Sequence, residues 1–285
     1  MADTIDSSNL VSILGTQCYL HKWEVANPKA LVVVFHGIGA HGAYPTVRYA
    51  AEFLSEAGYT VVAFDFPGHG RSEGLKGYLK SADYLVENGV AMVDHARSLY
   101  PDLPLVLCGS SMGGAICLLV SNELRKRNDG KPSVILLAPM LKLNVSSLER
   151  TGLQALNYLV PTQRLIPRKK SSGQYRDEEK KNECDTDPYS SPPGTSMRVG
   201  TALTCVDTAL NVAEAFESID NPYLLLIADE DTVVDSQGSE DFHRTSASQD
   251  KTKYNYPALH GLLCEPAPLY EKIKSDILDW LAKRV

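Results

Sequence analysis

Residues 103–120 read LPLVLCGSSMGGAICLLV. An apolar run ends in a Gly-Ser-Ser turn, and the small residues Gly113, Gly114 and Ala115 open a second apolar run with a helical pattern. A Gly-x-Ser-x-Gly segment exposes its serine as a nucleophile when a strand runs directly into the turn and a helix leaves directly from it. The stretch therefore predicts a nucleophile elbow at Ser111 within an α/β fold.

The same five-residue pattern occurs a second time, from Gly70 to Gly74. Its serine, Ser72, lies beyond a Pro-Gly-His-Gly loop, and Gly77 follows soon after. Because no strand enters this turn directly, the context is that of an ordinary polar loop residue. We therefore take Ser111 as the candidate nucleophile.

The sequence on both sides of the elbow alternates between strand and helix patterns. Short apolar runs predict strands at 30–35, 60–65, 103–109, 133–139, 222–229 and 251–257. Helical patterns predict helices at 45–57, 82–99, 112–127, 198–217, 235–248 and 269–285. Strands made almost entirely of Val, Leu and Ile indicate a parallel sheet that is covered on both faces. We expect an α/β fold with a mostly parallel central sheet, helices on both faces, and ligands at the carboxyl ends of the strands.

The alternation stops between residues 140 and 200. An apolar helical segment there gives way to a charged, turn-rich stretch, RKKSSGQYRDEEKKNECDTDPYSSPPG (168–194). We interpret residues 140–200 as an insertion into a core that consists of residues 1–139 and 201–285.

Charge and cysteine usage exclude several classes of protein. The 285 residues include 28 Lys and Arg and 35 Asp and Glu, a net charge of −7, without a dense basic block, which argues against a nucleic-acid partner. The cysteines form no Cys-x-x-Cys pair and suggest neither a zinc site nor a disulfide framework; they are Cys18, Cys108, Cys117, Cys184, Cys205 and Cys264. We find no signal-peptide pattern and no run of 18 apolar residues, so the expected location is the cytoplasm.

A serine nucleophile needs a histidine that takes its proton and a carboxylate that orients the histidine. On this fold the order along the chain is Ser, Asp, His, which leaves His243 and His260 as candidates after Ser111. His243 lies within a helical pattern, whereas His260 lies in a loop just after a predicted strand. We therefore predict His260 as the base.

The carboxylate is expected in the loop after the strand at 222–229. Three residues compete there: Asp229, Asp231 and Asp235. Asp229 ends the strand, and Asp235 suits the N-cap of the next helix. We therefore assign the catalytic acid to Asp231.

Two backbone N–H groups are needed to stabilise the tetrahedral intermediate. One belongs to the residue after the nucleophile, Met112, and the other to the loop after the strand at 30–35. That loop begins HGIGAH (36–41), in which glycines let the main chain approach the oxyanion. We predict Ile38 and Met112 as the two donors.

With these residues identified, the chain resembles the α/β-hydrolase superfamily, and within it the monoacylglycerol lipase group with its plant caffeoyl shikimate esterase-like and lysophospholipase-like relatives. The likeness covers nearly all of the chain. It rests on HGIGAH (36–41), FDFPGHGRSEGLKGY (64–78), GSSMGG (109–114), IADEDTVVDSQG (227–238) and LHGLLCEP (259–266). The resemblance implies an α/β-hydrolase fold without a metal or cofactor, and it places the family's catalytic Asp and His on Asp231 and His260 and its oxyanion donors on Ile38 and Met112. It also implies that residues 140–200 form the family's cap (lid), which encloses an acyl tunnel and touches membranes.

The loop after the first predicted strand is also the expected substrate-binding loop. Its candidate contacts are His36, Gly37, Gly39, Ala40, His41 and Tyr44. In the animal lipases that the chain resembles, an acidic residue and an Arg hold the glycerol headgroup, whereas this chain has Ala40 and Tyr44 at those positions. A cap Tyr that shares this role is replaced near Cys184.

These expectations lead to a functional hypothesis. We expect a serine hydrolase of carboxylic esters that acts through an acyl-enzyme, with monoacylglycerols as its first candidate substrates and a small lipophilic ester as its partner. Within this class, a lysophospholipase and a hydroxycinnamoyl esterase are the alternatives. A ligand-binding receptor on the same fold is the alternative from another class.

The insertion contains an apolar stripe between residues 148 and 166, followed by three basic residues. The stripe consists of Leu148, Leu153, Leu156, Leu159, Val160, Leu165 and Ile166, and the basic residues are Arg168, Lys169 and Lys170. Such a stripe either packs on the core or, beside basic residues, contacts an anionic lipid surface. We therefore expect peripheral membrane contact as an alternative to simple burial.

Overall fold

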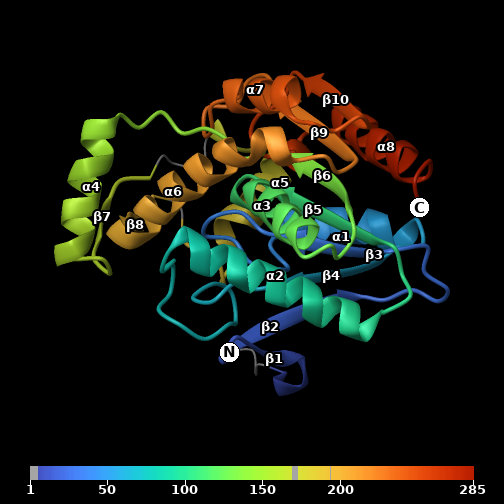
Figure 1. Cartoon of the computed structure of the whole chain (residues 1–285), viewed down its shortest axis with the longest axis horizontal. Coiled ribbons are helices and arrows are strands. Elements are labelled where there is room, and N and C mark those ends of the chain that lie inside the picture. The colour runs from blue at the N-terminus through green and yellow to red at the C-terminus, as the bar shows by residue number, and fades with distance from the viewer. Residues whose placement is uncertain (1–5, 169–172, 193) are drawn as a thin grey trace.

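The structure, a computed structural model, describes residues 6–168, 173–192 and 194–285. Its main sheet has eight strands in the order β1-β2-β4-β3-β5-β6-β9-β10 (Figure 1). The pairs β4–β3, β3–β5, β5–β6, β6–β9 and β9–β10 are all parallel, which confirms the expected α/β-hydrolase type of sheet. The strands are β1 Leu10–Ile13, β2 Thr16–Trp23, β3 Leu31–Phe35, β4 Thr60–Phe64, β5 Leu105–Ser110, β6 Ser133–Leu137, β9 Tyr223–Ala228 and β10 Lys251–Tyr256.

The first two strands were not predicted from the sequence. β1 pairs antiparallel with β2, and β2 pairs antiparallel with β4. Both strands are partly exposed and contain polar residues, so they lack the continuous apolar run of a strand buried on both faces. Leu14 and Gly15, which join them, have φ of 47° and 83°, as a two-residue hairpin turn of the primed type requires.

Helices cover both faces of the sheet (Figure 1). Val32 and Val34 of β3 pack with residues of α1 and α8 on one face, and Leu31, Val33 and Phe35 pack with residues of α2, α3 and α6 on the other. Because successive side chains of a strand point to opposite faces, a strand covered on both is apolar throughout. The helices around the sheet are α1 Pro45–Glu56, α2 Ala82–Leu99, α3 Met112–Lys126, α6 Val199–Ala215, α7 Gln237–Thr245 and α8 Leu269–Leu281.

The described part of the segment that was predicted to be an insertion contains the helices α4 Ser147–Leu159 and α5 Glu178–Thr186 and the strands β7 Arg164–Ile166 and β8 Met197–Arg198. β7 and β8 form a separate antiparallel pair. α4 packs against α6 and lies at the outer edge of the molecule (Figure 1). The helix α6 begins at Val199, within one residue of the predicted start. The division into core and cap at residues 140 and 200 stays a prediction.

The parallel strands bring distant segments together at one edge of the sheet. The loops that follow β3, β5, β9 and β10 all leave the sheet at the carboxyl ends of these strands. They carry Ile38, Ser111, Asp231 and His260, respectively. This is the edge at which an open α/β sheet binds its ligands.

Candidate active site

Ser111 occupies a sharp turn between a strand and a helix. β5 ends at Ser110 and α3 begins at Met112, so the turn consists of Ser111 alone. Its φ is 55° and its ψ is −122°, a strained conformation for a residue with a side chain. The Ser111 N–H donates to the carbonyl oxygen of Leu137 in β6 at 3.0 Å, which ties the turn to the neighbouring strand. The geometry is that of a nucleophile elbow.

Two glycines of the motif make this turn sterically feasible. A Cβ at Gly113 would lie 2.0 Å from the carbonyl oxygen of Phe35, and a Cβ at Gly109 would lie 2.3 Å from the carbonyl oxygen of Gly113. Both distances are far shorter than a van der Waals contact. The close approach of α3 to β3 and β5 therefore requires glycine at both positions.

The loop that carries Ile38 lies beside the serine turn, and Met112 directly follows Ser111 in the chain. A Cβ built at Gly37 would lie 3.5 Å from the Cβ of Ser111, so the loop after β3 contacts the serine turn. Met112 is the first residue of α3, where N–H groups have no partner within the helix. Neither N–H donates a hydrogen bond to any residue that the structure describes. Both are thus free to bind a developing oxyanion.

Asp231 and His260 form a hydrogen bond of 2.7 Å between Oδ2 and Nδ1. The other carboxylate oxygen of Asp231 accepts the N–H groups of Val233 at 2.7 Å and Val234 at 3.1 Å. Burial opposes ionisation of this carboxyl, but the hydrogen bond and charge of His260 and the two N–H groups lower its pKa below the usual value. An ionised Asp231 holds the proton on Nδ1, which leaves Nε2 of His260 able to accept one.

The competing residues have other partners. Asp229 accepts a hydrogen bond of 2.8 Å from an asparagine of β10. Asp235 accepts a backbone N–H at the start of α7 and forms an ion pair with a lysine at 3.3 Å. His243 lies in α7, 3.1 Å from a tyrosine hydroxyl of β9. Of these candidates, the structure brings together the pair chosen from the sequence.

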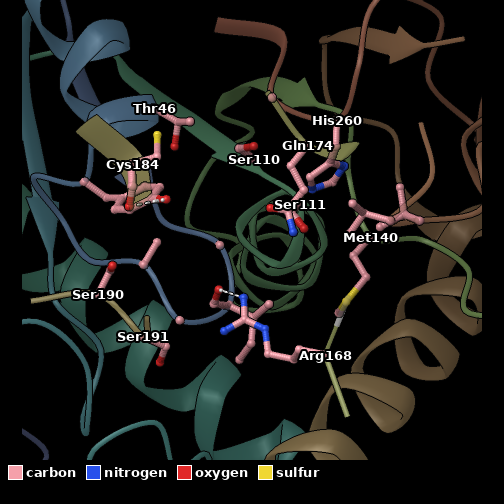
Figure 2. A pocket seen from close by; sticks show the side chains of 18 of the residues that line it. Thr46, Ser110, Ser111, Met140, Arg168, Gln174, Cys184, Ser190, Ser191 and His260 are labelled. Atoms are coloured by element: carbon pink, nitrogen blue, oxygen red, sulfur yellow. Dashed lines mark hydrogen bonds between the residues drawn. The ribbon is translucent and has the colours of Figure 1, made fainter. Parts of the chain in front are cut away.

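A cavity of about 280 Å³ lies over Ser111 and His260. Figure 2 shows both side chains at its wall, with residues of the segment 140–200 around them. Apolar side chains line one part of it, namely Met140, Leu143, Met197, Val233 and Val234. The cavity is therefore enclosed jointly by loops of the sheet and by residues of the segment 140–200.

Four of the six predicted substrate-binding residues line this cavity: Gly37, Gly39, Ala40 and Tyr44. His36, which was also predicted to do so, is fully buried behind the loop and is absent from the cavity wall. Its Nε2 accepts the N–H of Phe66 at 3.1 Å, and its Nδ1 donates to the carbonyl oxygen of Gly37 at 2.8 Å. Burial lowers the pKa of His36 to about 3, so the ring is neutral and holds the loop in place.

His41 also differs from the expectation. It does not line the cavity, and its Nε2 lies 2.9 Å from Oδ1 of Asp187 in the segment after α5. The Nδ1 accepts the N–H of Ala43 at 3.2 Å, so Nε2 is the donor to the carboxylate. His41 therefore ties the loop after β3 to the insertion instead of facing a substrate.

Several cavity residues from the insertion were missed in the sequence. The hydroxyl of Tyr175 lies 3.1 Å from the hydroxyl of Tyr44, which also donates to the carbonyl oxygen of Cys184 at 3.3 Å. Tyrosine hydroxyls are thus present beside Cys184. Arg168, which was grouped with a basic membrane surface, lines the cavity, and its Nη2 donates to the carbonyl oxygen of Ile38 at 3.5 Å. Its predicted companions at 169 and 170 lie outside the described residues.

Ser72, the serine of the second motif, is buried beneath the loops. Its hydroxyl donates to the carbonyl oxygen of Asp65 at 2.6 Å and accepts the N–H of Tyr19 at 2.8 Å. It does not line the cavity at Ser111. The interpretation as a nonfunctional loop serine agrees with this placement, although the residue is buried and joins the loop to β2.

One cluster of residues has the composition of a metal site. His21, His41 and Asp65 offer ligand atoms that lie within 4.8 Å of one another. These atoms already have protein partners, because Oδ1 of Asp65 binds Nε2 of His21 at 2.8 Å and the N–H of Gly42 at 2.6 Å, and Oδ2 binds the N–H of Arg71 at 2.7 Å. Burial opposes ionisation of Asp65, yet the hydrogen bond to His21 and the other bonds lower its pKa to about 2. The cluster stabilises the loops and gives no reason to propose a metal.

Comparison with known proteins identifies relatives over nearly the whole chain. A family model described as serine aminopeptidase, S33, matches residues 26–267. Monoglyceride lipase of Mus musculus is 30% identical over 98% of this chain and 91% of its own length. Caffeoylshikimate esterase of Arabidopsis thaliana is 28% identical over 90% of this chain and 79% of its own length.

Solved structures with the same fold include two lipases. A soluble variant of monoglyceride lipase from Saccharomyces cerevisiae, in complex with a substrate analog, superposes with a TM-score of 0.82 at 22% identity and covers 94% of this chain and 92% of its own. Monoacylglycerol lipase of Paleococcus ferrophilus superposes with a TM-score of 0.79 at 24% identity and covers 94% of this chain and 99% of its own. The chain therefore belongs to the serine aminopeptidase S33 family of α/β hydrolases and is a carboxylic ester hydrolase.

Proposed function

We propose that this chain hydrolyses monoacylglycerols to glycerol and a fatty acid, with Ser111, His260 and Asp231 as its catalytic triad. One observation carries the proposal: Ser111, in a strained turn, and His260, hydrogen-bonded to Asp231, face one cavity with an apolar wall. The apolar wall suits an acyl chain, and the serine and histidine suit the ester bond at its end.

The reaction proceeds in two halves. His260 Nε2 takes the proton of Ser111 Oγ as this oxygen attacks the ester carbonyl carbon, and Asp231 stabilises the imidazolium that forms. The N–H groups of Ile38 and Met112 bind the oxyanion of the tetrahedral intermediate. His260 then gives its proton to the leaving alcohol, and an acyl-enzyme remains. A water activated by the same imidazole attacks this acyl group and releases the fatty acid.

The names of the relatives and the cavity support the monoacylglycerol assignment. The mouse and yeast relatives are named for monoglycerides. The hydroxyls of Tyr44 and Tyr175 offer hydrogen-bonding groups for glycerol at the wall of the cavity. Residues 140–200 act as a cap in this proposal, since they supply Tyr175 and Met197 to the cavity that the core loops open.

A hydrolysis panel tests the substrate. Monoacylglycerols of several chain lengths are compared with lysophospholipids, caffeoyl esters and an amino acid anilide, the last because the family description names an aminopeptidase. We expect kcat/KM to be highest for a monoacylglycerol. A higher kcat/KM for a caffeoyl ester or a lysophospholipid would support ester hydrolysis but would contradict monoacylglycerol as the substrate.

Covalent labelling separates an enzyme from a binding protein of the same fold. A fluorophosphonate reacts with a serine that a base activates, and does not need a matching substrate. We expect stoichiometric labelling of the wild-type chain and none of Ser111→Ala. Failure to label the wild type, with the protein folded, would favour a ligand-binding role over catalysis.

We further propose that α4 of the cap contacts lipid surfaces. No helix among the described residues is long and apolar enough to cross a bilayer. Yet α4 contains no buried residue, and its Leu148, Tyr158 and Leu159 are 83%, 89% and 73% exposed. Leu148 and Leu159 are separated by eleven residues, close to three helical turns, so they share one face of the helix. Leu165 in β7 is also 54% exposed. Large apolar side chains gathered on an outer helix are typical of peripheral membrane contact.

Vesicle sedimentation tests the lipid contact. We expect weak, reversible binding of the wild type, a loss of binding in Leu148→Ser combined with Leu159→Ser, and unchanged hydrolysis of a short soluble ester. Leu99→Ser, which alters a leucine of α2 that is 45% exposed, serves as the control. Equal vesicle binding by the double variant and the wild type would contradict this role of α4.

A further inference from the structure

Arg168 is a charged side chain in the wall of the catalytic cavity. It follows β7 in the insertion, is half-buried, and lines the same cavity as Ser111 and His260. Figure 2 shows its guanidinium turned toward the interior of this cavity. Removing a charge from water costs free energy unless a partner compensates it. A half-buried Arg168 therefore needs an acceptor or an anion that compensates its charge.

The described residues supply almost no partner for the Arg168 guanidinium. A guanidinium has five N–H donors, and the hydrogen bond to the carbonyl oxygen of Ile38, at 3.5 Å, is the single one that Arg168 forms with described residues. It has no ion pair with a carboxylate of the described chain. Other arginines of the insertion are satisfied: Arg150 binds Asp207 at 2.8 Å, and Arg176 binds a glutamate at 2.8 Å. Among the described residues, most donors of Arg168 therefore have no acceptor.

The guanidinium of Arg168 contacts the loop after β3 at Ile38 and Gly39. Gly39 has a φ of 74°, and a Cβ at this position would lie 2.7 Å from Nη1 of Arg168 and 3.2 Å from the Cβ of Ser191. Arg168 and Ser191 thus both lie over Gly39. The N–H of Ser191 donates to the carbonyl oxygen of Gly39 at 2.8 Å, whereas its hydroxyl has no hydrogen-bond partner among the described residues. A cation and a free hydroxyl are held side by side at the cavity wall.

The part of the loop that Arg168 contacts lies close to Ser111. Arg168 contacts the carbonyl of Ile38, and the preceding residue, Gly37, packs against Ser111. A group bound by the guanidinium would therefore belong to the same molecule whose ester carbonyl lies at Ser111.

We propose that Arg168, together with the Ser191 hydroxyl, binds an anionic oxygen group, a phosphate or a carboxylate, on the alcohol part of the ester substrate. The planar guanidinium matches the paired oxygens of both groups, and its hydrogen bonds to them are charge-assisted. A glycerol hydroxyl would leave the charge uncompensated. The inference rests on the proposed ester hydrolysis at Ser111 and extends its substrates from neutral monoacylglycerols to anionic acyl esters.

The test compares three esters that share one acyl chain: decanoylglycerol, decanoylglycerol phosphate and decanoylglycerate. The first is neutral, the second carries a phosphate and the third a carboxylate, so the panel also separates the two sources of the anion. kcat/KM is measured for the wild type, Arg168→Gln, Arg168→Lys and the control Arg150→Gln, which removes a positive charge of the same insertion outside the cavity.

We expect the wild type to hydrolyse one of the anionic esters in addition to decanoylglycerol, and Arg168→Gln to lose about 10- to 100-fold in kcat/KM for that anionic ester, the range of a charge-assisted hydrogen-bond pair. Decanoylglycerol hydrolysis should stay within about twofold, because a neutral alcohol gains little from the cation. Arg168→Lys keeps the positive charge but not the planar, forked geometry of the guanidinium, and it should retain part of the activity on the anionic ester. Arg150→Gln should retain all of it.

Two results would overturn the inference while ester hydrolysis stands. The first is a wild type that hydrolyses decanoylglycerol but neither anionic ester, and the second is an Arg168→Gln variant without a selective loss for an anionic ester. If the wild type hydrolyses none of the esters, the proposed function is wrong. A binding measurement then tests the anion site separately. The ether analogue decylglycerol phosphate, which cannot be hydrolysed, is titrated calorimetrically into wild type and Arg168→Gln. Weaker binding to the variant supports the anion site, and equal binding or no binding to both refutes it.

Discussion

Replacing Asp231 by asparagine tests how His260 is oriented. In the wild type, Oδ1 of Asp231 accepts two backbone N–H groups, at 2.7 Å and 3.1 Å, and Oδ2 faces Nδ1 of His260 at 2.7 Å. The two backbone donors select the carbonyl oxygen of an asparagine, so its NH₂ group turns toward His260. The imidazole must then accept at Nδ1 and carry its proton on Nε2. In that tautomer it cannot take the proton of Ser111.

The expected loss in kcat is about 10⁴-fold, the size seen when a triad acid is changed to its amide. This corresponds to about 5.5 kcal/mol in the activation free energy. Folding should change much less, because asparagine has the same shape and keeps both backbone hydrogen bonds. Asp235→Asn is the matched control. Its carboxylate lies at the start of α7 and pairs with Lys142 instead of a histidine.

The assay is hydrolysis of a short soluble ester, which avoids any effect of vesicle binding, with circular dichroism and urea unfolding as measures of the folded state. Fluorophosphonate labelling rates provide a second readout, because labelling also requires the base. A folded Asp231→Asn enzyme within tenfold of the wild-type kcat would refute the assigned role, and so would a larger loss in Asp235→Asn than in Asp231→Asn.

Four further variants test the nucleophile, the second serine motif, the packing of the elbow and the buried carboxylate of Asp65. Ser111→Ala should abolish turnover and phosphonate labelling, whereas Ser72→Ala should keep its activity per folded molecule but lose about 1–3 kcal/mol of stability in urea, since its hydroxyl has two buried partners. Gly113→Ala should yield no soluble folded protein on expression, because the added Cβ would lie 2.0 Å from a backbone oxygen. Asp65→Asn should cost about 2 kcal/mol at neutral pH, the equivalent of lowering a pKa from its usual 3.8 to about 2. A lowered carboxyl pKa stabilises the fold above the unfolded pKa and loses this effect as the pH falls through the folded one. Urea melts should therefore show the difference between wild type and Asp65→Asn shrinking between about pH 4 and pH 2.

The sequence was sufficient for the elements whose pattern is local. Residues 103–120 contain the strand, the turn and the helix of the serine elbow, and each is decided by neighbours only a few positions away. The buried parallel strands were predictable for the same reason, because a strand covered on both faces has to be apolar at every position. The strands Leu10–Ile13 and Thr16–Trp23 were missed because both are partly exposed, and exposed strand positions tolerate polar residues.

For the candidate site, the sequence reduced the number of candidate residues but did not show how they are arranged. The fold's chain order reduced seven histidines to two and the local setting selected Asp231 among three acids, but the 2.7 Å hydrogen bond between residues 231 and 260 follows from the parallel register of β9 with β10. The roles of His36 and His41 were not readable, since both are polar residues in a glycine-rich loop. Only their partners, Phe66 and Asp187, reveal that they hold the loop.

Arg168 shows most clearly what could not be predicted from the sequence alone. In the sequence it opens a basic run, and such a run predicts a solvated or lipid-facing surface. The tertiary structure turns its guanidinium over Gly39, more than a hundred residues earlier in the chain, and into the cavity. Local patterns determine backbone conformation because the forces involved act between near neighbours. The direction of a long side chain is decided by the space and the charges that distant segments leave for it once they have packed together.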